Sequence, residues 1–180
     1  SKAKRERDYA VDAQREYVRN MYNHLSYASV WNKCVRHSLY KEHKIYTPQY
    51  GYAEDCYLMS QLVGYSSSIV HLDEYLYHYR KGNPNALTGQ QRRKRKREYA
   101  LNFLDLYERY KDVPTEENPV AVIFDDMLIQ AGWYSIFYRL DLFKQYPWLA
   151  AAVRKAKIKG GTEVTIFSQI ITKLALFFIK

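Results

Sequence analysis

Apolar side chains recur at helical spacing over most of this 180-residue chain. Between residues 8 and 25 they fall three and four apart toward the end, which predicts an amphipathic helix with its charged first turns facing water. The same spacing predicts helices over 53–65 and over 90–111. Residues 120–140 predict another helix, interrupted at Gly132.

The C-terminal part of the chain also has a helical pattern, with two breaks. Residues 141–157 predict a helix that is broken or kinked near Pro147, because a proline ring clashes with the preceding turn and lacks a backbone donor. Gly160 and Gly161 predict a hinge, and residues 162–180 predict a strongly apolar last helix.

Strand signals occur only in the first half of the chain. A β-branched start predicts a strand over 69–72, and alternating residue types predict a second strand over 76–80. Residues 30–39 form a mixed segment, compatible with a strand that ends in a helical turn. The sequence therefore predicts an α+β fold that is predominantly α-helical, with a few short strands and a helical tail.

Composition narrows the class of protein and its compartment. With 47% hydrophobic residues the chain is long enough to bury one core. Two cysteines, Cys34 and Cys56, are too few for a disulfide framework, and no secretory signal is visible, so a cytoplasmic location is expected.

Both cysteines together with His37 and His43 could be read as the four ligands of a zinc site. Their spacing matches no known zinc finger, so no metal site is predicted within the chain.

One basic segment and one apolar segment could each bind a partner at the protein surface. The chain has a net charge of +9, and residues 92–97 are all Arg or Lys, which suits nucleic acid phosphates or anionic lipid headgroups. Six consecutive basic residues spread around a helix rather than along one side, and no recognised nucleic-acid motif accompanies them. Nucleic acid is therefore not predicted as a partner. Apolar residues of 166–178 share one helix side, which leaves two alternatives open: a membrane surface, or packing against another part of the complete protein or a second subunit.

Two adjacent acids stand where the helix over 53–65 is expected to begin. Carboxylates are favourable near a helix N-terminus, so Glu54 and Asp55 serve as first-turn capping residues or as a functional pair. Neighbours on a helix point about 100° apart, so only one of the two acids can face a given atom. A second pair, Asp125 and Asp126, lies inside an expected helix and is interpreted as structural.

The acids at 54–55 belong to an ordered series of short motifs. They are Trp31-Asn32-Lys33, Arg36-His37-Ser38-Leu39, Ile45-Tyr46-Thr47-Pro48, Glu54-Asp55, Leu76-Tyr77-His78-Tyr79-Arg80 and the loop from Asn83 to Thr88. In this order the series resembles the acceptor-side half of a family 2 glycosyltransferase. The resemblance covers about a third of the chain and implies the GT-A nucleotide-diphospho-sugar transferase fold, with residues 1–88 as acceptor-side part and 89–180 as a helical C-terminal region.

The resemblance also implies roles for six residues. Asp55 matches the catalytic acid that removes the proton from the acceptor hydroxyl, and Glu54 would position its neighbour or the acceptor. Trp31 would stack on the acceptor sugar, with Lys33 of the same motif in the substrate-binding set. His78 and Arg80 would lie near the metal or the diphosphate.

The function implied is transfer of a sugar from a nucleotide-sugar donor to a hydroxyl acceptor, such as a growing surface polysaccharide. No strand-rich donor half precedes Trp31, so the chain is expected to be part of a longer enzyme and inactive alone. A Mg or Mn ion is expected in the intact enzyme, held mainly by residues outside this chain. The enzyme would act in the cytoplasm, with the inner face of the plasma membrane and a homo-oligomer left open. The alternative function is a noncatalytic basic module that binds anionic membrane or nucleic acid.

Overall fold

Helices make up all the regular secondary structure in the part of this computed structural model that is described, residues 11–24, 27–70, 74, 76–78, 92–160 and 164–178. The elements are α1 (Val11–Tyr22), α2 (Ser38–Glu42), α3 (Glu54–Tyr65), α4 (Arg92–Tyr110), the 3₁₀ turn η2 (Ala121–Ile123), α5 (Phe124–Phe137), α6 (Leu142–Gln145), α7 (Leu149–Lys155) and α8 (Ile166–Ala175). In these ranges no helix combines the length and apolar content that crossing a bilayer requires.

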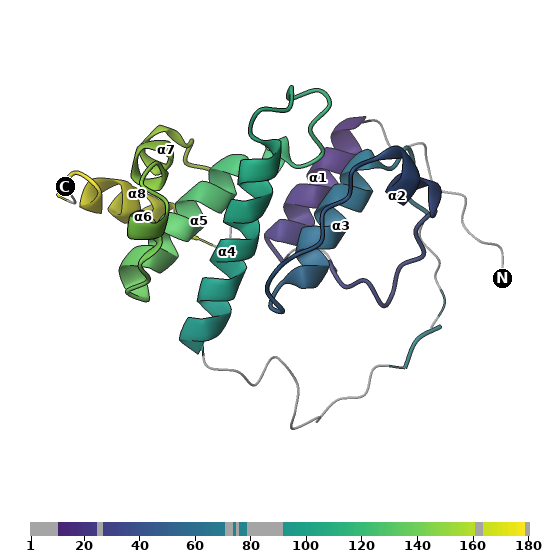
Figure 1. Ribbon diagram of the computed structural model, residues 1–180, viewed down its shortest axis with the longest axis horizontal. Coiled ribbons are helices and arrows are strands. Elements are labelled where there is room, and N and C mark those ends of the chain that lie inside the picture. The colour runs from purple at the N-terminus through teal and green to yellow at the C-terminus, as the bar shows by residue number, and fades with distance from the viewer. Residues whose placement is uncertain are drawn as a thin grey trace.

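The helices expected from hydrophobic spacing are confirmed. The longest, α4, lies in the middle of the molecule, with α1 and α3 on one side and α5 to α8 on the other (Figure 1). The break near Pro147 is also confirmed, since it separates α6 from α7. The interruption at Gly132 is wrong, since α5 runs through it. A Cβ at this position would lie 3.1 Å from Cγ2 of Thr172, so the glycine permits close packing of α8 on α5.

The predicted strands are wrong where the structure can test them. Ile69, Val70 and Leu76–His78 have no strand conformation, and the remaining strand positions lie outside the described residues. Residues 30–39 likewise contain no strand and end in the first residues of α2. A strand needs a partner to satisfy its backbone groups. Because no neighbouring strand exists in the described ranges, the fold is all-α there rather than α+β.

Aromatic side chains fill the centre of the core. Tyr22 of α1 meets Phe103 of α4 edge-on with ring centroids 4.8 Å apart, and Tyr99 lies 4.7 Å from the same Phe103 ring. All three side chains are almost fully buried. One continuous cluster of buried residues joins α1 and α3 to α4, α5, α7 and the end of α8, so the helices on both sides of α4 share a core.

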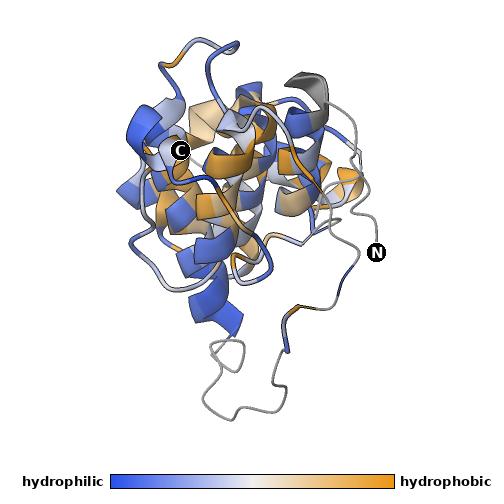
Figure 2. Ribbon diagram, turned by 90° about the vertical axis from the view of Figure 1, so that its right-hand side faces the viewer, coloured by the Kyte–Doolittle hydropathy of each residue, from blue (hydrophilic) through white to orange (hydrophobic). Residues whose placement is uncertain are grey.

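The basic run at 92–97 forms the first turns of α4 and is largely used within the chain. Figure 2 shows this end of α4 as strongly hydrophilic. Arg93 donates from Nε to Tyr138 O at 3.0 Å and from Nη2 to Arg139 O at 2.9 Å, while Lys96 Nζ donates to Tyr134 Oη at 2.7 Å. Cationic side chains at the C-terminal end of α5 donate hydrogen bonds to its last carbonyl groups and interact favourably with the negative end of the helix dipole. These contacts give much of the run an internal role.

Candidate active site

A short loop that is fixed by one buried side chain leads into α3. The Asn102 amide of α4, fully buried, donates to Tyr50 O and Tyr52 O, both at 2.9 Å. Its Oδ1 accepts the backbone N–H of Tyr50 at 3.1 Å. Ala53 then adopts the left-handed conformation, with φ 66° and ψ 21°, as the residue that precedes the helix. These contacts and this turn set the direction in which α3 begins.

The predicted acid pair occupies the first turn of α3. Glu54 and Asp55 are both half-buried, so neither is sealed in the core. Burial raises the pKa of Glu54, the nearby charges of Asp55 and Glu98 raise it further, and the Glu54 backbone N–H opposes the shift. No side chain caps this helix start, so the two acids are the groups that complement its dipole.

Lys33 is within electrostatic reach of Asp55. Partial burial lowers the pKa of the Lys33 ammonium, and the negative charge of Asp55 opposes that shift. Lys33 Nζ donates to Tyr27 O at 2.7 Å, to Ser29 O at 2.8 Å and to Asn32 Oδ1 at 2.9 Å. An ammonium has three donors, so Lys33 uses all of them to fix the conformation of the 27–33 segment.

Trp31, two residues before Lys33, stacks on Tyr77. The ring centroids are 4.5 Å apart and the planes differ by 27°. Trp31 is 41% exposed and Tyr77 51% exposed, so the pair presents aromatic surface to solvent. The 31–33 turn thus contacts one of the other sequence motifs, through Trp31 and Tyr77, and is within electrostatic range of a second, through Lys33 and Asp55.

The remaining predicted residues are less well placed. His78 is exposed and follows Tyr77 directly in sequence. Arg80 lies outside the described residues. Because 76–78 is not a strand, the expectation that His78 and Arg80 share one strand face has no support in the described residues.

No metal centre is formed by the residues that the structure describes. Across these ranges no three His, Cys, Asp or Glu side chains come together as a group able to hold a metal ion. Of the zinc alternative, Cys34 is exposed and Cys56 is buried, and the His43 ring stacks on Tyr65 with centroids 4.0 Å apart. A divalent ion with ligands outside this chain stays a prediction.

The second acid pair lies in the first turn of α5. Asp125 forms an ion pair with Lys159, Oδ2 to Nζ 3.0 Å. Asp126 is buried and lines a cavity of about 10 Å³, a volume that suits a single water molecule. Burial raises the pKa of Asp126, while the positive charges of Lys159 and Arg19 oppose the shift.

Sequence reasoning missed two residues that shape the site. Tyr77 was within a quoted motif, but its contact with Trp31 depends on the fold. Asn102 was missed entirely, although a polar residue between Leu101 and Phe103 in an apolar stripe is a usable signal for a buried hydrogen-bonding role.

Comparison with known proteins gave no relative: no family model, no curated protein and no solved structure matches this chain.

Proposed function

We propose that this chain forms the acceptor side of a family 2 glycosyltransferase, which in complete form has the GT-A fold. The complete enzyme transfers a sugar from a nucleotide-diphospho-sugar to a hydroxyl acceptor, such as a growing surface polysaccharide. One observation carries the proposal. The Trp31–Lys33 turn stacks on Tyr77 through Trp31 and is within electrostatic range of Asp55 through Lys33, so three motifs far apart in sequence come near one another.

Asp55 acts as the base in this proposal. Its carboxylate accepts the proton of the acceptor hydroxyl while that oxygen attacks the anomeric carbon of the donor sugar. The bond from the anomeric carbon to the diphosphate breaks, and the nucleoside diphosphate leaves with the electron pair. Half-burial leaves Asp55 open to an acceptor, and the helix N-terminus favours a carboxylate at this position.

Lys33 and Glu54 support Asp55 in different ways. Lys33 is a positioning residue, because its three donors are occupied by the 27–33 segment while its charge acts on Asp55 electrostatically. Glu54 is next on the helix and points about 100° away, so it contacts the acceptor or orders the helix start rather than sharing the proton transfer.

The aromatic pair supplies the acceptor-binding surface. An indole and a phenol ring offer apolar faces with polar edges, which suit the C–H face and the hydroxyl rim of a pyranose. Trp31 and Tyr77 are already stacked on each other and half exposed, so little ordering is needed before a sugar binds. A divalent ion held elsewhere in the complete enzyme would neutralise the leaving diphosphate.

The test is release of nucleoside diphosphate by the full-length gene product, measured over a panel of nucleotide sugars and glycan acceptors. Asp55→Asn should lower the rate by about 100-fold or more, because it removes the base but keeps the shape. Asp112→Asn is the matched control, since it removes one charge from an exposed site at the end of α4 and should leave transfer unchanged. Near-normal transfer by Asp55→Asn would remove it from the base role.

A further inference from the structure

The last helix turns its apolar side outward. In α8 and the turn that follows it, the polar Gln169 and Thr172 are buried. The exposed residues are apolar: Ile166, Phe167, Ile170, Leu174, Phe177 and Phe178. Phe177 and Phe178, at 72% and 88% exposed, stand out furthest. A helix on the surface of a globular protein ordinarily has the reverse arrangement. These six exposed residues are called the α8 apolar surface below.

Hydrogen bonds fix α8 in this orientation. Gln169 Nε2 donates to Lys159 O and to Val164 O, both at 2.7 Å, and its Oε1 accepts the backbone N–H of Lys159 at 3.1 Å. The Thr172 side chain faces Gly132 of α5, where a Cβ would lie 3.1 Å from Thr172 Cγ2. Rotating α8 to bury its apolar residues would break the Gln169 bonds, so the outward apolar side is a property of the fold.

Basic residues at the C-terminal end of α7 lie beside the C-terminal part of α8. Lys173 Nζ donates to Arg154 O at 3.0 Å and also to Ala156 O, and Arg154 donates to Leu176 O, so the C-terminal end of α7 is held beside α8. Lys155 and Lys157 at that end are exposed. From residue 142 to residue 180 the sequence contains seven basic residues, Lys144, Arg154, Lys155, Lys157, Lys159, Lys173 and Lys180, and one acid, Glu163.

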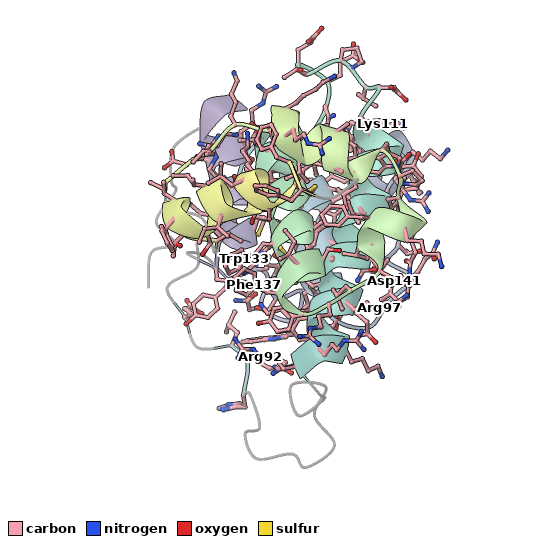
Figure 3. The ribbon with its side chains drawn as sticks, turned by 90° about the vertical axis from the view of Figure 1, so that its left-hand side faces the viewer. Arg92, Arg97, Lys111, Trp133, Phe137 and Asp141 are labelled. Atoms are coloured by element: carbon pink, nitrogen blue, oxygen red, sulfur yellow. The ribbon has the colours of Figure 1, made fainter. Side chains whose placement is uncertain are left out.

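Aromatic side chains of α5 lie on the same side of the molecule. Figure 3 views this side, with α8 in front and Trp133 and Phe137 just below it. The two rings are in contact, and Phe137 is itself largely exposed. Apolar and aromatic groups next to Lys and Arg are the composition of a helix that lies in a membrane interface.

We infer that α8 docks on a membrane surface that contains anionic lipid. Phe167, Phe177 and Phe178 would enter the boundary between headgroups and acyl chains, while Lys155 and Lys157 meet lipid phosphates. A ten-residue helix is only about 15 Å long, half the thickness of the hydrocarbon layer, so α8 lies along the surface. An excess of basic residues complements this partner, and the inference is independent of the proposed transferase activity.

Co-sedimentation with phosphatidylcholine vesicles, with and without phosphatidylglycerol, tests the inference. Binding should require phosphatidylglycerol and weaken with added salt. The double change Phe177→Ser with Phe178→Ser should lower the partition coefficient about tenfold or more, since both rings are removed from the lipid boundary. Lys155→Ala and Lys157→Ala should each lower it about fivefold. Leu76→Ser, equally exposed at 72% but remote in sequence, is the control and should bind as the parent does.

Equal binding to vesicles without phosphatidylglycerol, or binding that survives the double phenylalanine change, would overturn the inference. Absence of vesicle binding would overturn it as well. If sedimentation equilibrium then shows self-association that the double change abolishes, a second copy covers the α8 apolar surface instead. Circular dichroism of each variant verifies that these exposed substitutions leave the helical content intact.

Discussion

At the scale of single residues, backbone conformation at Ala53 decides where α3 begins. Pro48 and Gly51 mark a break in the sequence, yet the left-handed conformation falls on Ala53 rather than on Gly51. Side-chain periodicity carries no information on which residue of a loop takes a positive φ. The start of α3, and with it the acid pair, was predictable; the strained residue before it was not.

Ala53→Gly should therefore stabilise the protein. A left-handed L-residue costs about 1–2 kcal/mol, whereas glycine costs about 0.5–1 kcal/mol in lost chain freedom. The free energy of unfolding in urea should rise by about 0.5–1 kcal/mol. Ala100→Gly, inside α4, should instead lower the free energy of unfolding by at least about 1 kcal/mol, since it loses helix propensity and a buried methyl group. A loss of stability in Ala53→Gly would contradict the conformation given for Ala53.

Asp126 makes the stability of the folded protein depend on pH. Its pKa in the folded protein is raised above the ordinary value of 3.8 by burial, although the positive charges of Lys159 and Arg19 oppose the shift. The folded state therefore binds more protons than the unfolded state between those two pKa values, and stability falls as pH rises through that window.

Asp126→Asn should remove this contribution. The free energy of unfolding of the variant, minus that of the parent, should increase as pH rises from about 3.8, by at most about 1.4 kcal/mol per pH unit, and then level off. Urea titrations at a series of pH values measure it. A difference that stays constant, or that decreases with pH, would show that the Asp126 pKa is not raised.

At the scale of elements, hydrophobic spacing predicted the helices well because burial of one helix side is what produces that spacing. Strand prediction failed at Ile69, Val70 and Leu76–His78, where β-branched and alternating residues suggested strands but no pairing partner exists in the described ranges. Hydrophobic spacing also could not predict the orientation of α8, which depends on Gln169 bonding to Lys159, ten residues away.

Two helical glycines, Gly64 and Gly132, lie where other elements pack closely, so an alanine at each position tests how tight that packing is. A Cβ at Gly64 of α3 would lie 2.5 Å from Pro119 Cβ and 2.6 Å from Pro119 O, where backbone blocks it. A Cβ at Gly132 would meet only methyl groups of Thr172 and Val153, at 3.1–3.3 Å. Alanine gains about 1 kcal/mol in helix propensity at both, and overpacking costs about 1–3 kcal/mol.

Gly64→Ala should therefore lower the free energy of unfolding by about 1–2 kcal/mol, while Gly132→Ala changes it by about 1 kcal/mol at most in either direction. Chemical denaturation of the two variants side by side gives the comparison. If Gly132→Ala proves the more damaging, the approach of α3 to Pro119 is looser than described.

At the scale of the whole molecule, the candidate site exists only because distant segments meet. Asn102 reaches back 52 residues to Tyr50, and Trp31 stacks on Tyr77 across α2 and α3. Motif order along the chain predicted that Trp31, Lys33 and Asp55 belong together. It did not predict that Lys33 would use its donors within its own turn, because hydrogen bonds to backbone carbonyls leave no trace in residue type.

The most direct test of the site separates proton removal from acceptor binding. Steady-state kinetics with varied acceptor should show that Asp55→Asn lowers kcat with little change in KM, since the base acts in the transition state. Trp31→Ala should raise KM for the acceptor and largely keep kcat, because stacking contributes to binding in ground and transition states alike. If this surface does not hold the acceptor, the two variants will not differ in this way: both will change the same kinetic parameter, or neither will change kcat or KM.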